Sequence, residues 1–246
     1  MFKVVIPARY ASTRLPGKPL LDIAGKPMVV WVAEQAIKSQ ADQVVIATDF
    51  RKIADVAETF GYQAVMTRID HVSGTDRIAE VADKLAWPDD AIVVNVQGDE
   101  PLIDPNLINE VALTLAHNRE AVMATACHPI HDEVSFLNPN IVKVVMDTHG
   151  NALYFSRAPI PYPRDEAHKQ NITAYRHIGI YAYRVGFLKQ YADLEATELE
   201  KTESLEQLRV LYHGYKIAVT VTDKAPASGV DTQADLDYVR SVMPSC

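Results

Sequence analysis

Cysteine and long apolar runs are what this sequence has least of. The 246-residue chain contains two cysteines, Cys127 and Cys246, and Cys127 lies in an apolar run that is typical of a small buried side chain. A disulfide framework and a cysteine-based metal site are therefore not expected, and a reducing cytoplasm is the favoured location. No apolar run could span a bilayer, and a strand begins directly after Met1, so neither a membrane span nor a signal peptide is expected.

The chain also has fewer basic than acidic residues. Lysine and arginine number 24 against 32 aspartates and glutamates, which gives a formal net charge of −8 at pH 7. This balance argues against a general nucleic-acid binder and against a protein of the membrane surface. The Gly-x-x-x-x-Gly-Lys-Ser/Thr and Gly-x-Gly-x-x-Gly phosphate motifs are absent as well. A phosphate site in this chain would depend mainly on side-chain cations rather than on a glycine nest.

Three cations nevertheless gather near the amino terminus. The apolar run 4–6 predicts a buried strand that stops at Pro7, and the loop that follows contains Arg9, Arg14 and Lys18. Guanidinium and ammonium groups at the carboxyl end of a strand predict a polyphosphate-binding loop. The alternative is a solvated surface loop, since arginine and lysine are usually exposed.

The order of apolar runs and helical periodicities predicts the fold class. Strands are expected at 4–6, 43–48, 63–66, 91–96, 121–127, 177–184 and 216–221, and helices at 28–39, 51–60, 73–85, 104–118, 204–212 and 232–242. Alternation of the two indicates an α/β protein with a mostly parallel central sheet covered by helices on both faces. A small antiparallel hairpin, 141–147 with 152–156, and an irregular proline-rich arm at 159–175 are expected as an insertion.

Two acidic residues are candidates for binding a metal ion. Asp99 follows a fully apolar strand, opposite the predicted phosphate loop, and Asp231 lies in the segment Gly229-Val230-Asp231-Thr232. Mg²⁺ takes one or two carboxylates and fills its other positions with water and phosphate oxygens, which predicts a magnesium site here. The alternatives are that Asp99 caps a turn before Pro101 and that Asp231 or Thr232 caps the last helix.

Several other polar residues have two interpretations. Ser73 could be no more than the N-cap of a helix, whereas Arg77 and Gln97 could read the polar edge of a base. The segment 176–184 alternates large polar residues with small apolar ones, which permits a half-buried strand that presents His177 to a cleft.

Seven segments together resemble the 3-deoxy-manno-octulosonate (Kdo) cytidylyltransferase family, the CMP-Kdo synthetases. They follow one another along nearly the whole chain, at 9–19, 70–77, 96–101, 154–157, 176–184, 205–209 and 229–232. The resemblance implies a nucleotide-diphospho-sugar transferase fold, a cytoplasmic homodimer, and supply of CMP-Kdo for lipopolysaccharide in Gram-negative bacteria. It also implies one nucleotidyltransferase domain over 1–246, with a dimerisation and sugar-binding lobe at about 141–190.

The resemblance assigns roles to residues that match the family's motifs. Arg9, Arg14 and Lys18 would hold the CTP triphosphate, Asp99 and Asp231 would bind Mg²⁺, and Ser73, Arg77 and Gln97 would face the cytosine and its surroundings. The candidates for holding Kdo are Arg157, Arg164, His177, Tyr181, Glu206 and Gln207. The implied reaction is attack by the anomeric hydroxyl of Kdo on the α-phosphate of CTP, with pyrophosphate leaving. Two alternatives stay open: a synthetase for another acidic sugar, of the CMP-sialic acid type, and a non-catalytic CTP sensor on the same fold.

Overall fold

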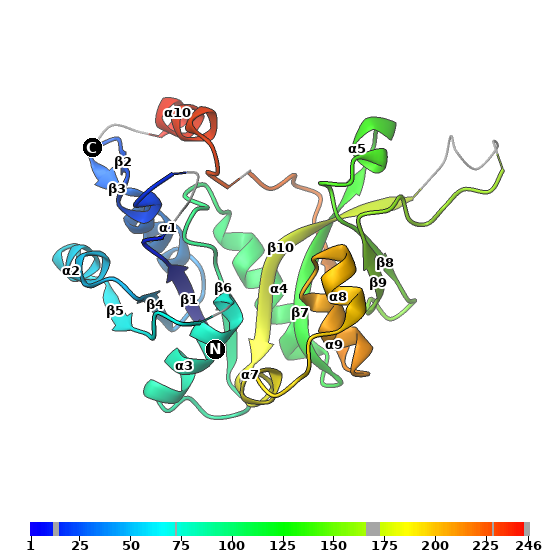
Figure 1. Ribbon diagram of the computed structural model, residues 1–246, viewed down its shortest axis with the longest axis horizontal. Coiled ribbons are helices and arrows are strands. Elements are labelled where there is room, and N and C mark those ends of the chain that lie inside the picture. The colour runs from blue at the N-terminus through cyan, green and yellow to red at the C-terminus, as the bar shows by residue number, and fades with distance from the viewer. Residues whose placement is uncertain (12–14, 72, 166–172, 228, 244–246) are drawn as a thin grey trace.

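The computed structural model describes residues 1–11, 15–71, 73–165, 173–227 and 229–243 (Figure 1). Its large sheet contains strands β1 (Lys3–Ala8), β4 (Gln43–Thr48), β5 (Gln63–Met66), β6 (Ile92–Asn95), β7 (Ala121–Ile130), β8 (Lys143–Met146), β9 (Ala152–Ser156), β10 (Ala174–Arg184) and β11 (Lys216–Val221). A second, two-stranded sheet pairs β2 (Asp22–Ile23) with β3 (Lys26–Pro27).

Helices surround the large sheet. They are α1 (Met28–Ile37), α2 (Arg51–Thr59), α3 (Gly74–Lys84), α4 (Pro105–His117), α5 (Glu133–Leu137), α7 (Val185–Tyr191), α8 (Glu198–Glu203), α9 (Gln207–Tyr212) and α10 (Gln233–Val242), with a 3-10 turn, η1, at Lys18–Leu20. None of the helices in the described segments is long and apolar enough to cross a membrane.

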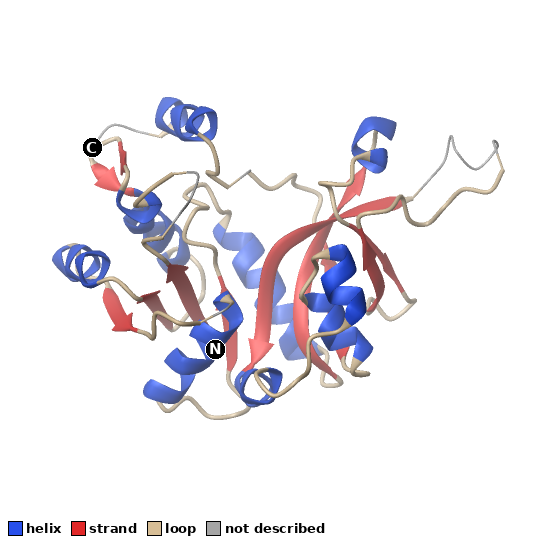
Figure 2. Ribbon diagram, in the orientation of Figure 1, coloured by secondary structure: helices blue, strands red, loops and turns tan. Residues whose placement is uncertain are grey.

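The strands run in the order β11-β7-β10-β6-β1-β4-β5, and the β8–β9 hairpin joins this path through β10. The pairs β6–β1, β1–β4, β4–β5 and β11–β7 are parallel, whereas β10 is antiparallel to both β6 and β7. The predicted α/β class with a mostly parallel sheet is therefore confirmed, and Figure 2 shows helices on both sides of the red strands.

Alternate residues of β1 show why the sheet is covered on both faces. Val4 and Ile6 pack into one apolar cluster with α1 and α4, whereas Val5 packs into another with α3 and α7. All three side chains are fully buried. Because successive residues of a strand point to opposite faces, an unbroken apolar run of this kind belongs to a strand that is buried on both sides.

The lobe that carries the β8–β9 hairpin contains the predicted insertion. Gly150 adopts φ +76° in the turn that joins the two strands, a conformation that glycine tolerates without strain. The arm expected at 159–175 has no regular secondary structure up to residue 165, residues 166–172 lie outside the described part of the chain, and β10 begins at Ala174. The helix expected at 204–212 begins at Gln207, because Ser204 has φ +51° and ends the separate helix α8.

Candidate active site

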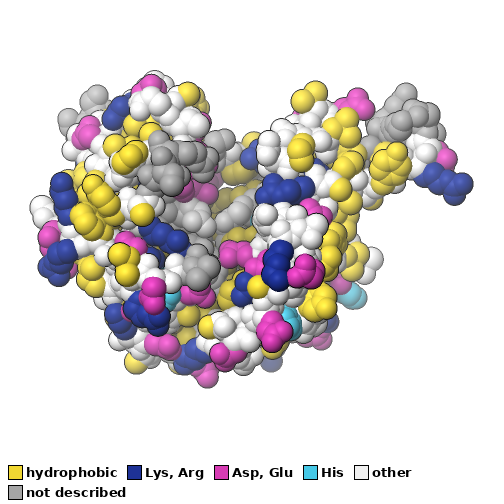
Figure 3. Space-filling view, in the orientation of Figure 1, with side chains coloured by type: hydrophobic (Ala, Val, Ile, Leu, Met, Phe, Trp, Pro, Cys, Tyr) yellow, Lys and Arg dark blue, Asp and Glu magenta, His cyan; other side chains and the backbone are white. Residues whose placement is uncertain are grey.

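The carboxyl ends of β1 and β6 form one side of a polar pocket with a volume of about 420 Å³. Its lining comes from three parts of the chain that are distant in sequence, and it includes Arg9, Lys18, Gln97, Asp99 and Asp231. Figure 3 shows that the molecule is hollowed between its two halves. The sequence-based prediction placed a ligand site at this edge of the sheet, where open α/β sheets bind their ligands.

Lys18 contacts both predicted metal ligands. Its Nζ donates to Asp99 Oδ2 at 2.6 Å, to Asp231 Oδ1 at 3.0 Å and to the carbonyl of Val230 at 2.9 Å. Burial alone would lower the pKa of Lys18, but the hydrogen bonds and negative charges of Asp99 and Asp231 outweigh it and raise that pKa. The ammonium is therefore charged at neutral pH, and it draws two acidic side chains to one point.

Local backbone geometry explains how Lys18 reaches this position. Gly17 has φ +66°, which few other residues adopt, and η1 begins directly after it with Pro19 in its first turn. A Cβ atom on Gly17 would lie 3.3 Å from the ring of Tyr10, which itself stacks on Phe50 at a centroid distance of 4.0 Å. The turn thus packs against an aromatic pair and directs Lys18 into the pocket.

Gly98 allows the two strand ends to approach each other closely. A Cβ atom at this position would lie 2.6 Å from the carbonyl oxygen of Pro7, a distance that real Cβ atoms do not tolerate. Glycine at this position thus allows a close approach to the end of the neighbouring strand β1. This contact positions Asp99 beside Lys18.

Glu100 follows the pocket residue Asp99, and the sequence assigned it no role. Burial, together with the negative charge of neighbouring Asp99, raises the pKa of Glu100 to about 8. Its only sequence signal was its place next to Asp99 in the motif 97–101. The carbonyl of Val230, which accepts from Lys18, was also missed because a backbone contact leaves no signature in residue type.

Asp99 and Asp231 form a donor set that fits a small divalent cation. Their oxygens lie within hydrogen-bonding distance of the same ammonium nitrogen, so one cation can be reached by both. Among the described residues, no group of three or more His, Cys, Asp or Glu side chains could hold a metal ion. A pair of carboxylates that leaves other positions to water and phosphate is the pattern that Mg²⁺ uses.

The structure describes only one of the two arginines that were predicted to bind phosphate. Arg9 lines the pocket beside Lys18, and its positive charge also acts on the carboxyl group of Glu206 from the other half of the molecule. Arg14 lies outside the described residues. The structure therefore brings Arg9 and Lys18 together, and the role of Arg14 stays a prediction.

Of the residues predicted to face cytosine, only Gln97 lines the pocket. Ser73 is the N-cap of α3: its hydroxyl accepts from the N–H of Asp76, as its alternative interpretation held. Arg77 is fully buried, and its guanidinium binds Thr67 Oγ1 and forms an ion pair with Asp49 at 2.9 Å. Two of the three guanidinium nitrogens of Arg77 are thus bound to Thr67 and Asp49, and a contact of Arg77 with the base stays a prediction.

Three of the predicted sugar-binding residues line a second cavity, of about 510 Å³. Tyr181 on β10 and Glu206 and Gln207 at the start of α9 contribute to its wall. Burial raises the pKa of Glu206, the charge of Glu200 adds to the effect, and Arg209 and Arg9 oppose it. The Nε2 of Gln207 is buried and has no hydrogen-bond partner in the described structure, so it is an unsatisfied donor next to this cavity.

His177 lies close to this wall and is neutral. It packs edge-on against Phe155 and lies 5.4 Å from the ring of Tyr181, measured between centroids. The Thr125 hydroxyl donates its single proton to a carbonyl of β10, so it accepts a hydrogen bond from His177 Nε2 at 3.0 Å. Burial lowers the pKa of His177 to about 3.

The two arginines proposed for the Kdo carboxylate occupy other places. Arg157 donates from Nε to the carbonyl of Glu203 at 2.6 Å and from Nη1 to that of Pro139 at 3.1 Å. Two of its three guanidinium nitrogens are thus bound to backbone carbonyls, one at the end of α8 and one in the loop between α5 and β8. Arg164 is exposed on the arm. The structure does not bring either arginine to Glu206 and Gln207, and their contact with a sugar stays a prediction.

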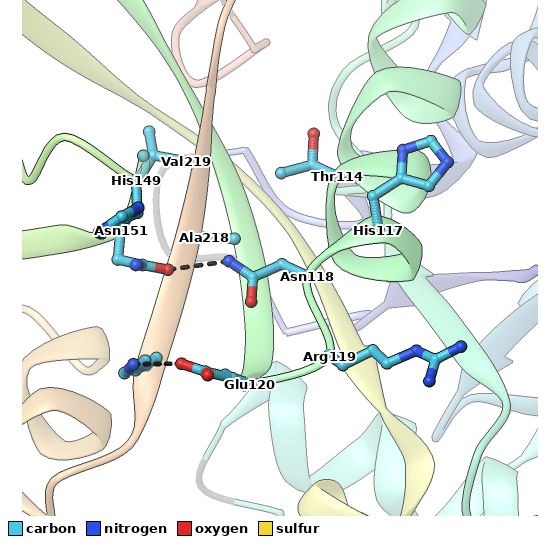
Figure 4. A pocket seen from close by; sticks show the side chains of 11 residues that line it. Thr114, His117, Asn118, Arg119, Glu120, His149, Asn151, Ala218 and Val219 are labelled. Carbon is cyan, nitrogen blue, oxygen red and sulfur yellow. Dashed lines mark hydrogen bonds and ion pairs between the residues drawn. The ribbon is translucent and has the colours of Figure 1, made fainter.

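A larger pocket, of about 630 Å³, lies between the end of α4, the β8–β9 turn and β11 (Figure 4). Its polar side chains satisfy one another: Asn118 donates to Asn151 at 2.9 Å, and Lys216 pairs with Glu120. His117 and Arg119 point away from the Asn118–Asn151 pair in Figure 4. None of the predicted site residues lines it, so the pocket at β1 and β6 is the candidate active site.

Comparison with known proteins agrees with this geometry. Residues 3–217 match the family model described as Cytidylyltransferase. A solved structure of a CMP:2-keto-3-deoxy-manno-octonic acid synthetase complexed with CTP is 43% identical, with 98% of both chains covered and a TM-score of 0.92. A cytidylyltransferase from Leptospira borgpetersenii serovar Hardjo-bovis (strain JB197) is 17% identical over 98% of this chain and 85% of that chain, with a TM-score of 0.62, and shows the fold alone. The chain belongs to the cytidylyltransferase family.

Proposed function

We propose that this protein transfers the cytidylyl group of CTP to Kdo, which is 2-keto-3-deoxy-manno-octonic acid, and releases pyrophosphate. The observation that carries the proposal is the convergence of Lys18, Asp99 and Asp231 in the pocket at the ends of β1 and β6. The likeness to a CTP-bound synthetase of the same sugar over 98% of both chains supports the choice of both substrates. The expected setting is the cytoplasm, with CMP-Kdo passing to lipopolysaccharide synthesis.

The chain's own residues suit charge stabilisation and positioning, which dominate phosphoryl transfer. Arg9 and Lys18 face the triphosphate and neutralise charge that moves onto the departing pyrophosphate. Glu206 and Gln207 face the sugar from the second cavity, where a carboxyl group and an amide can form hydrogen bonds with its hydroxyl groups.

Asp99 and Asp231 are proposed to hold Mg²⁺. When bound there, a divalent cation supplies positive charge next to the α-phosphate and the attacking hydroxyl. The two carboxylates would hold it at the point where their oxygens converge, which Lys18 Nζ contacts in this structure.

A homodimer through the lobe at about 141–190 is also proposed. Leu153 and Tyr162 are 61% and 76% exposed, and Val134 on the adjacent α5 is 80% exposed. Figure 3 shows yellow apolar side chains along the flank of this lobe. Light scattering of the wild type should give twice the monomer mass. The double variant Leu153→Asp/Tyr162→Asp should give a lower mass, closer to that of the monomer. Ile69→Asp, at a position 82% exposed on the other half, is the control that should not.

Pyrophosphate release tests the function directly. We expect release from CTP in the presence of Kdo and Mg²⁺, and far less from ATP, GTP or UTP or without Kdo. Sialic acid in place of Kdo should be a poor acceptor. Equal release with sialic acid would favour the CMP-sialic acid type of enzyme, and CTP binding without any release would favour a CTP sensor.

A further inference from the structure

Lys18 is already fully engaged in the nucleotide-free protein. An ammonium group has three N–H donors, and those of Lys18 go to Asp99, Asp231 and the carbonyl of Val230. In this arrangement Lys18 has no donor left for a phosphate, and the carboxylate oxygens that would hold a divalent cation face an ammonium instead. The roles proposed for the three side chains therefore cannot all be fulfilled until Lys18 moves.

We propose that Lys18 is an internal counter-ion that fills the divalent-cation position and leaves it only when the nucleotide triphosphate arrives. The inference rests on the proposed function, since it assumes that Asp99 and Asp231 bind the metal ion. Its consequence is an order of binding, in which the carboxylate pair becomes a metal site once the phosphates have taken over the donors of Lys18.

The electrostatics of the cluster favour this exchange. The Lys18 side chain is 15% exposed, whereas those of Asp99 and Asp231 are 32% and 46% exposed, so solvent and ions reach the carboxylates more readily than the ammonium. A metal ion that arrives alone must displace a cation and leave it partly buried without its partners, which costs free energy. A triphosphate removes that cost because its oxygens accept the same donors.

The side chain of Lys18 can make this movement. Lysine carries a compact charge on a flexible stem of four carbons, and Lys18 and Arg9 line the same pocket. The backbone is held separately, by η1 and by the Gly17 turn, so the ammonium can move without moving the loop. Because coupling between two ligands is reciprocal, CTP should strengthen metal binding by the same factor by which the metal strengthens CTP binding.

Mn²⁺ binding, measured by electron paramagnetic resonance without nucleotide, tests the inference. We expect Lys18→Met to bind Mn²⁺ at least about 10-fold more tightly than the wild type, since the competing cation is gone. Adding Asp99→Asn to Lys18→Met should abolish the gain, which locates the ion. Lys216→Met, which removes a lysine at the distant pocket of Figure 4, should leave Mn²⁺ affinity unchanged.

Equal Mn²⁺ affinity in wild type and Lys18→Met, whether weak or tight, would overturn the inference. Lys18→Gln, which keeps length and polarity without charge, serves if the methionine variant does not fold. The two proposals fail separately: wild-type pyrophosphate release from CTP and Kdo is measured alongside. Release with equal Mn²⁺ affinities refutes the exchange alone, and absence of release refutes the proposed function.

Discussion

Lys18 donates to two acidic side chains and a carbonyl group, and it is assigned to the triphosphate during the reaction. A contact that strengthens as the bond to pyrophosphate breaks lowers kcat when it is removed. Charge-assisted hydrogen bonds contribute roughly 1.5–3 kcal/mol, so Lys18→Ala should lower kcat/KM for CTP on the order of 10- to 100-fold. Lys216→Ala is the control, and a loss below about twofold in Lys18→Ala would count against a phosphate contact.

Arg77 forms a buried ion pair with Asp49, whose side chain is 10% exposed. Removing one partner of such a pair leaves an uncompensated charge, so Arg77→Leu should lower the free energy of unfolding by about 3–5 kcal/mol. Arg77→Leu with Asp49→Leu should recover part of the loss, and Arg51→Leu at the exposed Arg51–Asp55 pair should cost about 1 kcal/mol or less. Urea unfolding measures the wild type and the three variants; a stable Arg77→Leu with a raised KM for CTP would favour the base-reading role.

His177 should make stability depend on pH. Its pKa is about 3 in the folded protein against an ordinary value of 6.5, so the unfolded chain takes up a proton that the folded one does not between those values. Stability should therefore fall as the pH drops below about 6.5, by up to about 2 kcal/mol at about pH 5. Thermal melting at about pH 7 and pH 5 should show a smaller drop for His177→Gln than for wild type. His117→Gln, at an exposed position, should behave like wild type, and an equal drop in all three proteins would contradict the assignment.

The parallel strands β1 and β6 bring the two sides of the pocket together. Gly98→Ala would place a methyl group 2.6 Å from the Pro7 carbonyl and force the strand ends apart. Because small misplacements of site residues cost orders of magnitude in rate, we expect turnover to fall on the order of 10- to 100-fold. Gly179→Ala, where a Cβ would meet nothing within 4 Å, is the matched control. Normal turnover in Gly98→Ala would show that the close approach is not needed.

Elements with strong local signals were predictable from sequence. The strands 43–48, 63–66 and 216–221 match their predicted bounds because each is a short apolar run bounded by turn residues. The antiparallel insertion of β10 between β6 and β7 was not predictable, since it depends on pairing across distant parts of the chain. Helices α7 and α8 were missed because they are short and weakly periodic.

Site residues near strand ends were predictable from sequence, whereas contacts that depend on tertiary placement were not. Arg9 and Asp99 were predicted to lie near each other because both follow strands that end at one edge of a parallel sheet, and Lys18 belongs to the same loop as Arg9. Asp231, in the loop before α10, was predicted only as a second acidic candidate. The ion pair of Arg77 with Asp49 was not predicted, because it depends on tertiary placement and leaves no sign in the motif. Lys143 was not singled out, yet its buried Nζ donates to the carbonyls of Asn138, Ile141 and Arg157 and holds the hairpin lobe together, a role that depends only on tertiary placement.

The pocket near β1 and β6 is proposed to bind CTP, and the larger pocket in Figure 4 is not. The pocket near β1 and β6 has charged groups that converge, whereas the larger one in Figure 4 has polar groups that already satisfy one another. Volume alone would favour the pocket in Figure 4 as the CTP site, so the proposal depends on the chemistry of the residues that line each pocket.

Hydrogen–deuterium exchange with and without CTP tests this choice across the whole chain. We predict that CTP with Mg²⁺ slows exchange in peptides that contain Arg9, Lys18, 97–99 or Asp231, because these residues line the pocket at β1 and β6. Peptides that cover 114–120, 147–151 and 216–219 should exchange as in the free protein. Protection confined to this second set, with none at the strand ends, would contradict the proposed site.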